Sequence, residues 1–147
     1  MILDKLKKIT DICILVENVE RTVEFYTEKL DFELRRRAEG FADFHAHGVT
    51  LAAWEIDHIN RHTGVSNTRS PKHAHKACVA VELESPASVD ELYKELSERG
   101  VHFCGAPASY EWNAHCAYFT DPDGTLWELY AWNTGGPDDY HKTDQER

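Results

Sequence analysis

The sequence contains the same order of predicted elements twice, and this internal repeat restricts the fold more than any other feature. In residues 9–55, an alternating β-branched segment is followed by an amphipathic helix and three short extended segments. Residues 76–132 repeat this β-α-β-β-β order. The segments VENVERTVEFYTEKL and VELESPASVDELYKEL, one from each half, are also similar. The repeat predicts an α+β protein of two tandem βαβββ units.

The patterns also predict where each element begins and ends. In the first half we expect strands at residues 9–16, 32–37, 41–47 and 49–55, and a helix from the N-cap Asn18 to about Lys29. In the second half we expect strands at residues 77–83, 101–107, 115–120 and 125–132, and a helix that begins with a capping box of Ser88 and Glu91 and ends near Gly100. A polar linker at 56–75, with a short helical turn at its start, and a polar tail at 133–147 complete a single domain.

A βαβββ unit has a helix to cover one face of its sheet and nothing to cover the other. Two such units are therefore expected to bring their open faces around a shared interior. An interior of this kind is a natural cavity for a ligand.

The charge balance narrows the class of ligand. The net charge is −10, from 26 acidic and 16 basic residues, which argues against nucleic acid and against an anionic membrane surface. A small neutral or apolar molecule is the better expectation. The sequence lacks a signal-peptide pattern and any run of about 20 apolar residues, and its four cysteines are dispersed, so we expect reduced thiols and a cytoplasmic protein.

One acidic residue lies in an aromatic strand. After the turn sequence Asp121-Pro122-Asp123-Gly124, alternation places Leu126, Glu128, Tyr130 and Trp132 on one face, and Trp127 on the face that should pack against a helix. Aromatic rings on an open face are suited to a flat ligand. The candidate ligand-binding residues are Trp54, Tyr118, Tyr130, Trp132, His45 and Trp112.

The histidines have two interpretations each. His45 and His47 share a strand face with Asp43, so they either supply imidazoles to a cavity or are solvated at a strand end. His58 and His62 lie in the linker and either bind metal adventitiously or are solvated. His115 either orients a ligand or makes a structural hydrogen bond.

The tandem units, the segment FYTEKLDFEL and the pattern F-x-DPDG-x-x-x-EL closely resemble the vicinal oxygen chelate superfamily, over about residues 9–132. This superfamily includes glyoxalase I, extradiol dioxygenases, and fosfomycin- and bleomycin-resistance proteins. The resemblance implies a homodimer and, in metal-using members, a divalent ion such as Zn, Mn, Fe or Ni. It places Glu128 at the glutamate ligand position, Asp11 at the first usual histidine position, and Cys78, or Lys76 if the alignment shifts by two residues, at the second. Ala52 stands at the fourth position, which therefore has no ligand.

Neither of the two usual histidine ligands is present, and two functions are consistent with this difference from metal-using members. The first is a metal-independent protein that binds a small, mostly apolar or aromatic molecule for resistance or sequestration. The second is a metal-dependent lyase, isomerase or ring-cleaving dioxygenase, in which Glu128 holds a metal that chelates vicinal oxygens of the substrate. Either Asp11 and Cys78, or His45 or His47, complete the set of ligands. An interaction or regulatory module with an unused cavity is a third class.

Overall fold

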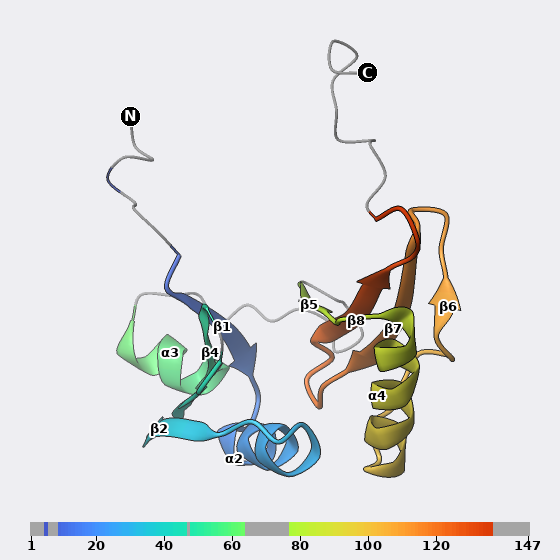
Figure 1. Ribbon diagram of the computed structural model, residues 1–147. Helices are drawn as coiled ribbons and strands as arrows, with labels where there is room; N and C mark the ends of the chain where they lie inside the picture. Colours follow the sequence, from blue (N-terminus) through green and yellow to red (C-terminus); the bar gives the residue numbers. More distant parts are fainter. Residues whose placement is uncertain (1–4, 6–8, 47, 64–76, 137–147) are drawn as a thin grey trace. The chain divides into compact units, whose positions relative to one another are not determined.

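The computed structural model describes residues 5, 9–46, 48–63 and 77–136, which belong to two compact units, residues 1–74 and 75–147 (Figure 1). Each unit contains one four-stranded sheet, with strand orders β1-β4-β3-β2 and β5-β8-β7-β6. In each sheet the first strand lies parallel to the last, and the other neighbours are antiparallel. The α+β class and the repeated topology are therefore confirmed. In the described residues no helix is long and apolar enough to cross a membrane.

The first unit contains β1 (Asp11–Val16), α2 (Val19–Glu24), the π-helical turn η1 (Phe25–Lys29), β2 (Leu34–Ala38), β3 (Phe41–Phe44), β4 (Thr50–Glu55) and α3 (Ile56–His62). Asn18 caps α2 as predicted, because its Oδ1 accepts a hydrogen bond from the backbone N–H of Arg21 at 2.9 Å. The predicted helical turn at the start of the linker is α3. The predicted strand at 41–47 already ends at Phe44, and His47 lies outside the described residues.

The second unit contains β5 (Cys78–Glu82), α4 (Pro86–Glu98), β6 (Ala108–Ser109), β7 (Ala114–Thr120) and β8 (Leu126–Trp132). The predicted strand at 101–107 is wrong. Phe103 makes only an isolated bridge to Phe119, and the fourth strand is the two-residue β6. Gly105 and Pro107 explain the difference, since glycine favours bends and proline cannot donate to a strand ladder.

The start of α4 also differs from the prediction. Ser85 is the N-cap: its Oγ accepts from the backbone N–H of Ser88 at 3.2 Å, and the two hydroxyls lie 2.9 Å apart. The predicted capping box of Ser88 and Glu91 is therefore placed one turn too late. Pro86 explains the earlier start, because proline is preorganised for the first helical position and needs no partner there. Gly100, with φ of +86°, follows the end of the helix as expected.

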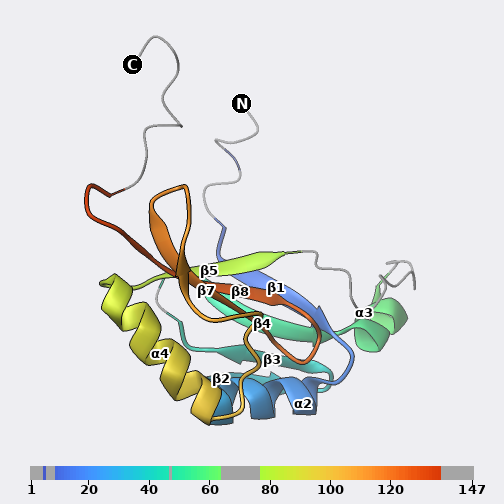
Figure 2. The ribbon, with the colours of Figure 1, turned by 90° about the vertical axis from the view of Figure 1, so that its right-hand side faces the viewer.

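Each sheet is covered by its helix on one face. In the second unit α4 packs on β7 and β8 (Figure 2), against the buried residues Trp127 and Leu129. Trp127 stacks on Phe119 with ring centroids 5.8 Å apart, which confirms its predicted helix-facing orientation. In the first unit α2 packs on β3 and β4. The opposite, open faces carry the candidate site residues.

Candidate ligand-binding site

The turn before β8 fixes which side chains reach the open face of the second unit. The Asp121 carboxylate accepts hydrogen bonds from the backbone N–H groups of Asp123 at 2.9 Å and Thr125 at 2.8 Å, and Gly124 adopts a φ of +81°. This turn sets the antiparallel register in which Glu128 pairs with Tyr118. Alternation along β8 then places Glu128, Tyr130 and Trp132 on the face opposite α4.

A cavity of about 310 Å³ lies on this open face. It is lined by Ala80, Trp112, Ala114, Glu128, Tyr130 and Trp132. The rings of Tyr130 and Trp132 lie edge to face, with centroids 5.5 Å apart and planes at 77°. Trp112 stacks on Tyr110 with centroids 4.6 Å apart, which orients the indole that lines the cavity. Ala80 and Ala114 contribute only methyl groups, so the space between the rings stays open.

Glu128 is the acidic group of this cavity, and its carboxylate is held by a neighbouring phenol. The hydroxyl of Tyr118 donates a hydrogen bond to Glu128 Oε2. Burial, followed by this hydrogen bond, raises the pKa of Tyr118 well above its ordinary value, so the phenol stays protonated and remains a donor. The arrangement fixes one carboxylate oxygen and leaves the acid among aromatic rings.

Of the predicted ligand-binding residues, the structure brings together Trp112, Tyr130 and Trp132 as lining of this cavity, with Tyr118 bonded to Glu128. Sequence reasoning missed Ala80 and Ala114. The sequence feature that could have identified them is their small size at the strand positions that pair with Glu128 and Trp132. Small residues are common in strands, so this signal is visible only once the register is known.

Trp54 lines a different cavity, of about 340 Å³, in the first unit. The other lining residues are Ala38, Glu39, Phe41 and His58. The indole Nε1–H of Trp54 donates to His58 Nδ1 at 2.9 Å, and the His58 ring stacks on His62 with centroids 4.1 Å apart. These two histidines therefore make structural contacts on α3.

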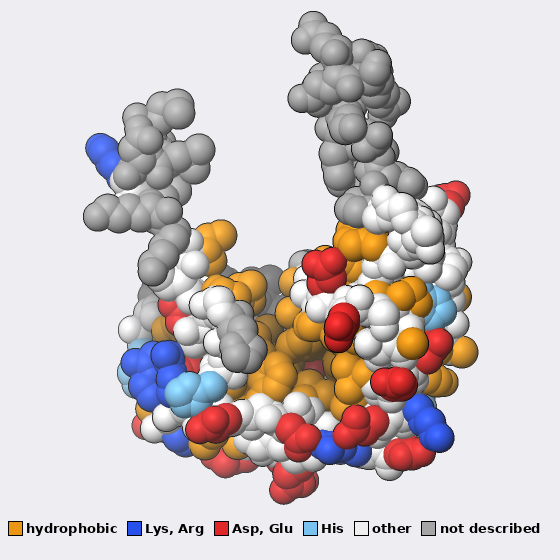
Figure 3. Space-filling model, viewed as in Figure 1, with side chains coloured by type: hydrophobic (Ala, Val, Ile, Leu, Met, Phe, Trp, Pro, Cys, Tyr) orange, Lys and Arg blue, Asp and Glu red, His pale blue; other side chains and the backbone are white. Residues whose placement is uncertain are grey.

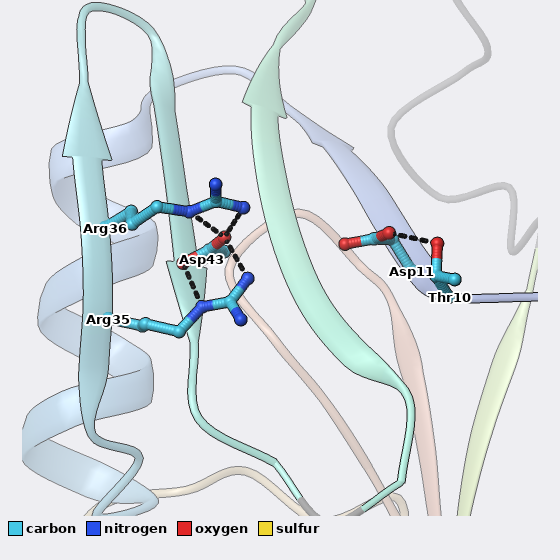
Figure 4. A network of polar contacts seen from close by, with 5 residues as sticks. All are labelled: Thr10, Asp11, Arg35, Arg36 and Asp43. Carbon is cyan, nitrogen blue, oxygen red and sulfur yellow. Dashed lines mark hydrogen bonds and ion pairs between the residues drawn. The ribbon is translucent and has the colours of Figure 1, made fainter.

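The open face of the first unit carries a charged network (Figure 4). Asp43 is fully buried and accepts hydrogen bonds from Arg35 Nε and Nη2 at 3.1 and 2.7 Å, and from Arg36 Nε and Nη2 at 2.9 and 2.7 Å. A shift in the β2–β3 register at this point explains how two consecutive arginines reach one carboxylate. Asp11 lies exposed on β1 and accepts from the Thr10 hydroxyl at 2.5 Å.

His45 lies just beyond the end of β3 and is exposed, with its Nε2 3.9 Å from a carboxylate oxygen of Glu33. Asp43, its predicted neighbour on the strand face, is occupied by the two arginines. His115 makes the structural contacts of the second interpretation: its Nε2 lies 2.7 Å from Asp90 on α4, and its Nδ1 lies 3.1 Å from the Ser109 hydroxyl.

Comparisons with known proteins identify the family. Residues 8–129 match the model of the Glyoxalase/Bleomycin resistance protein/Dioxygenase superfamily. A crystal structure of a glyoxalase/bleomycin resistance protein/dioxygenase from Nocardioides shares 45% identity and a TM-score of 0.84, over 88% of this chain and 86% of that one. The chain belongs to this superfamily.

Solved structures of lower sequence identity share the fold. A glyoxalase-related enzyme from Fulvimarina pelagi is 19% identical, with a TM-score of 0.70 over 85% of this chain and 88% of that one. A family enzyme from Burkholderia phytofirmans PsJN is 13% identical, with a TM-score of 0.72 over 84% and 97% of the two chains.

Many members of the superfamily use a divalent metal, and the donors among the residues that the structure describes fit one poorly. A thiol binds metal as the thiolate, but burial, followed by the charge of Glu128, raises the pKa values of Cys78 and Cys116. One oxygen of Glu128 already accepts from Tyr118. Within the described residues, no three His, Cys, Asp or Glu side chains form a group that could hold a metal ion.

Proposed function

We propose that this protein binds a small, mostly apolar or aromatic molecule in the cavity of the second unit, in the manner of a resistance or sequestration protein. The observation that carries the proposal is the cavity lining. Three aromatic side chains, Trp112, Tyr130 and Trp132, line a space open to solvent in which Glu128 is the charged group. Flat apolar molecules stack on such rings, and a single polar group fixes their orientation.

The alternative function is the metal-dependent lyase, isomerase or ring-cleaving dioxygenase. Family membership and the position of Glu128 in a cavity support it. The raised pKa values of Cys78 and Cys116 weigh against it, because a metal must displace the thiol proton and this costs more when the pKa is higher. Binding without metal is therefore the function that these residues support better.

Isothermal titration calorimetry against a panel of neutral and charged aromatic compounds tests the proposal. We expect at least one compound to bind to the wild type and not to Ala80→Phe, because the added ring fills the cavity from β5. Ala87→Leu, on the exposed surface of α4, is the matched control and should bind normally. If no compound of the panel binds, or if a compound binds equally well to Ala80→Phe and Ala87→Leu, the cavity is not the site.

Metal analysis after chelation and rebinding separates the two functions. We expect no stoichiometric metal in wild type or Glu128→Gln. One equivalent of Zn, Mn, Fe or Ni that binds to the wild type and is lost in Glu128→Gln would establish the metal-dependent alternative.

We also propose that the protein acts in the cytoplasm as a homodimer. Dimers are common in the superfamily, and the edge strand β1 exposes Ile12 and Leu15. Light scattering during size-exclusion chromatography should give twice the 16.9 kDa chain mass. A monomer at micromolar concentration would contradict the assembly.

A further inference from the structure

The open face of the second unit has acidic groups that form no ion pair with any basic residue that the structure describes. Glu82 pairs with Tyr130 across neighbouring strands, so it shares the face of Glu128. Among the described residues, neither carboxylate has an ion pair. Residues 77–136 contain ten Asp and Glu but only two Lys and Arg, and these two, Lys94 and Arg99, belong to α4 and its C-cap, against the other face of the sheet.

Figure 3 shows the side of the second unit on which α4 lies, where acidic side chains also stand among hydrophobic ones and a basic side chain lies at the lower edge. A carboxylate beside apolar surface loses hydration, and a hydroxyl donor such as Tyr118 does not neutralise its charge. The site therefore favours a positive charge.

The neighbouring titratable groups respond to the same negative potential. Burial raises the pKa of Cys78 and of Cys116 first, and the charge of Glu128 raises each further. Burial, Glu82 and Glu128, in that order, raise the pKa of Tyr130. In each case the negative carboxylates disfavour a second negative charge, as they would favour a cation.

The aromatic lining suits one kind of cation. The rings of Tyr130 and Trp132 stand at 77° to one another, and Trp112 lines the same space. The faces of such rings attract a cation, and the attraction is strongest for Trp. A primary ammonium group needs acceptors for three N–H bonds, whereas an alkylated ammonium group has few or none and presents methyl groups to the rings.

We infer that this cavity binds the alkylated ammonium group of a small organic cation, with Trp112, Tyr130 and Trp132 around the methyl groups and Glu128 as the counter-charge. The inference rests on the proposed binding function and narrows it to a ligand class. Glu82 adds to the negative potential at the edge of the site.

A pair of probes of equal shape tests the inference. The cation is 4-(hydroxymethyl)-N,N,N-trimethylanilinium, and its neutral counterpart is 4-tert-butylbenzyl alcohol, in which carbon replaces the charged nitrogen. We expect calorimetry to give the cation an affinity at least about tenfold higher, because cation–π attraction and the carboxylate act only on the charge. Equal affinities would overturn the inference and leave the binding function intact. If neither probe binds, the inference is wrong, and the titrations against the panel of aromatic compounds then decide whether the binding function stands.

Two variants of equal net charge identify the counter-charge. Glu128→Gln should lose most of the preference for the cation, while Glu91→Gln, on the exposed surface of α4, should keep it. Because Gln retains an oxygen that accepts from Tyr118, Glu128→Gln should fold, which circular dichroism can verify. A preference that is unchanged in Glu128→Gln would contradict the role given to this carboxylate.

Discussion

At the scale of single residues, the contact between Tyr118 and Glu128 determines how the acid can act. A carboxylate beside aromatic rings needs a hydrogen-bond donor, and the buried phenol supplies one without adding a positive charge. The acid is thereby oriented but not neutralised. An arginine in the place of Tyr118 would hold the same oxygen and cancel the charge that we assign to ligand binding.

Tyr118→Phe should lower the free energy of unfolding by about 1–2 kcal/mol at pH 7, because Glu128 loses its donor. The pKa of Tyr118 is raised above the ordinary value near 10, so its contribution is complete below that pH and is lost as the pH rises toward the pKa of the folded state. Urea denaturation should therefore show a difference in the free energy of unfolding between wild type and Tyr118→Phe that is smaller above pH 10 than at pH 7. Tyr93→Phe is the control, and a constant difference would contradict the assignment.

At the scale of elements, alternation and the internal repeat predicted the strands of both sheets, apart from the one expected at 101–107, and the faces of β8. They could not predict which side chains pair. The contact of Tyr118 with Glu128 depends on the β7–β8 register, and strict alternation would place Arg35 and Arg36 on opposite faces. The irregular pairing of β2 with β3 breaks the alternation of side chains between the two faces, and no local sequence pattern predicts this irregularity.

Arg35 and Arg36 on β2 both form ion pairs with Asp43 on β3, so Asp43 links the two strands. Asp43→Asn should lower the free energy of unfolding by about 2 kcal/mol at pH 7, a modest value because both guanidinium groups are partly exposed. Hydrogen bonds from Arg35, then Arg36, hold the pKa of Asp43 well below its usual range. The contribution is therefore present above about pH 4 and is lost as the pH falls further.

Urea denaturation at pH 7, 5 and 3 checks this prediction. The difference between wild type and Asp43→Asn should shrink between pH 5 and 3, while Glu24→Gln, on the exposed side of α2, should stay close to wild type throughout. A difference that persists unchanged at pH 3 would mean that packing rather than charge explains the loss.

The start of α4 offers a test of the revised helix boundary. Ser85→Ala removes the acceptor for the Ser88 N–H and should cost about 1 kcal/mol of stability. Ser88→Ala keeps that acceptor and loses only the contact between the two hydroxyls, so its cost should be smaller. Thermal denaturation of both variants measures the difference. The reverse order would restore Ser88 as the cap, as the sequence pattern alone suggested.

At the scale of the whole molecule, the charge distribution matters more than any single contact. The net charge is −10, and residues 77–136 hold ten of the acidic side chains against two basic ones. This excess of acidic residues is the reason why the sequence argues against nucleic acid as a partner. The inference of a cationic ligand rests on the same excess. The excess also predicts a high association rate for a cationic ligand, because a negative electrostatic potential concentrates cations near the surface.

The association rate of the trimethylanilinium probe should therefore depend on salt. We expect it to fall about threefold or more between roughly 20 and 500 mM NaCl, because screening shortens the reach of the field from about 20 Å to a few ångströms. The dissociation rate, set by contacts within the cavity, should change less. Stopped-flow tryptophan fluorescence measures both, and 4-tert-butylbenzyl alcohol provides the neutral control. An equal salt dependence for the two probes would show that the acidic field does not guide the ligand, whatever its affinity.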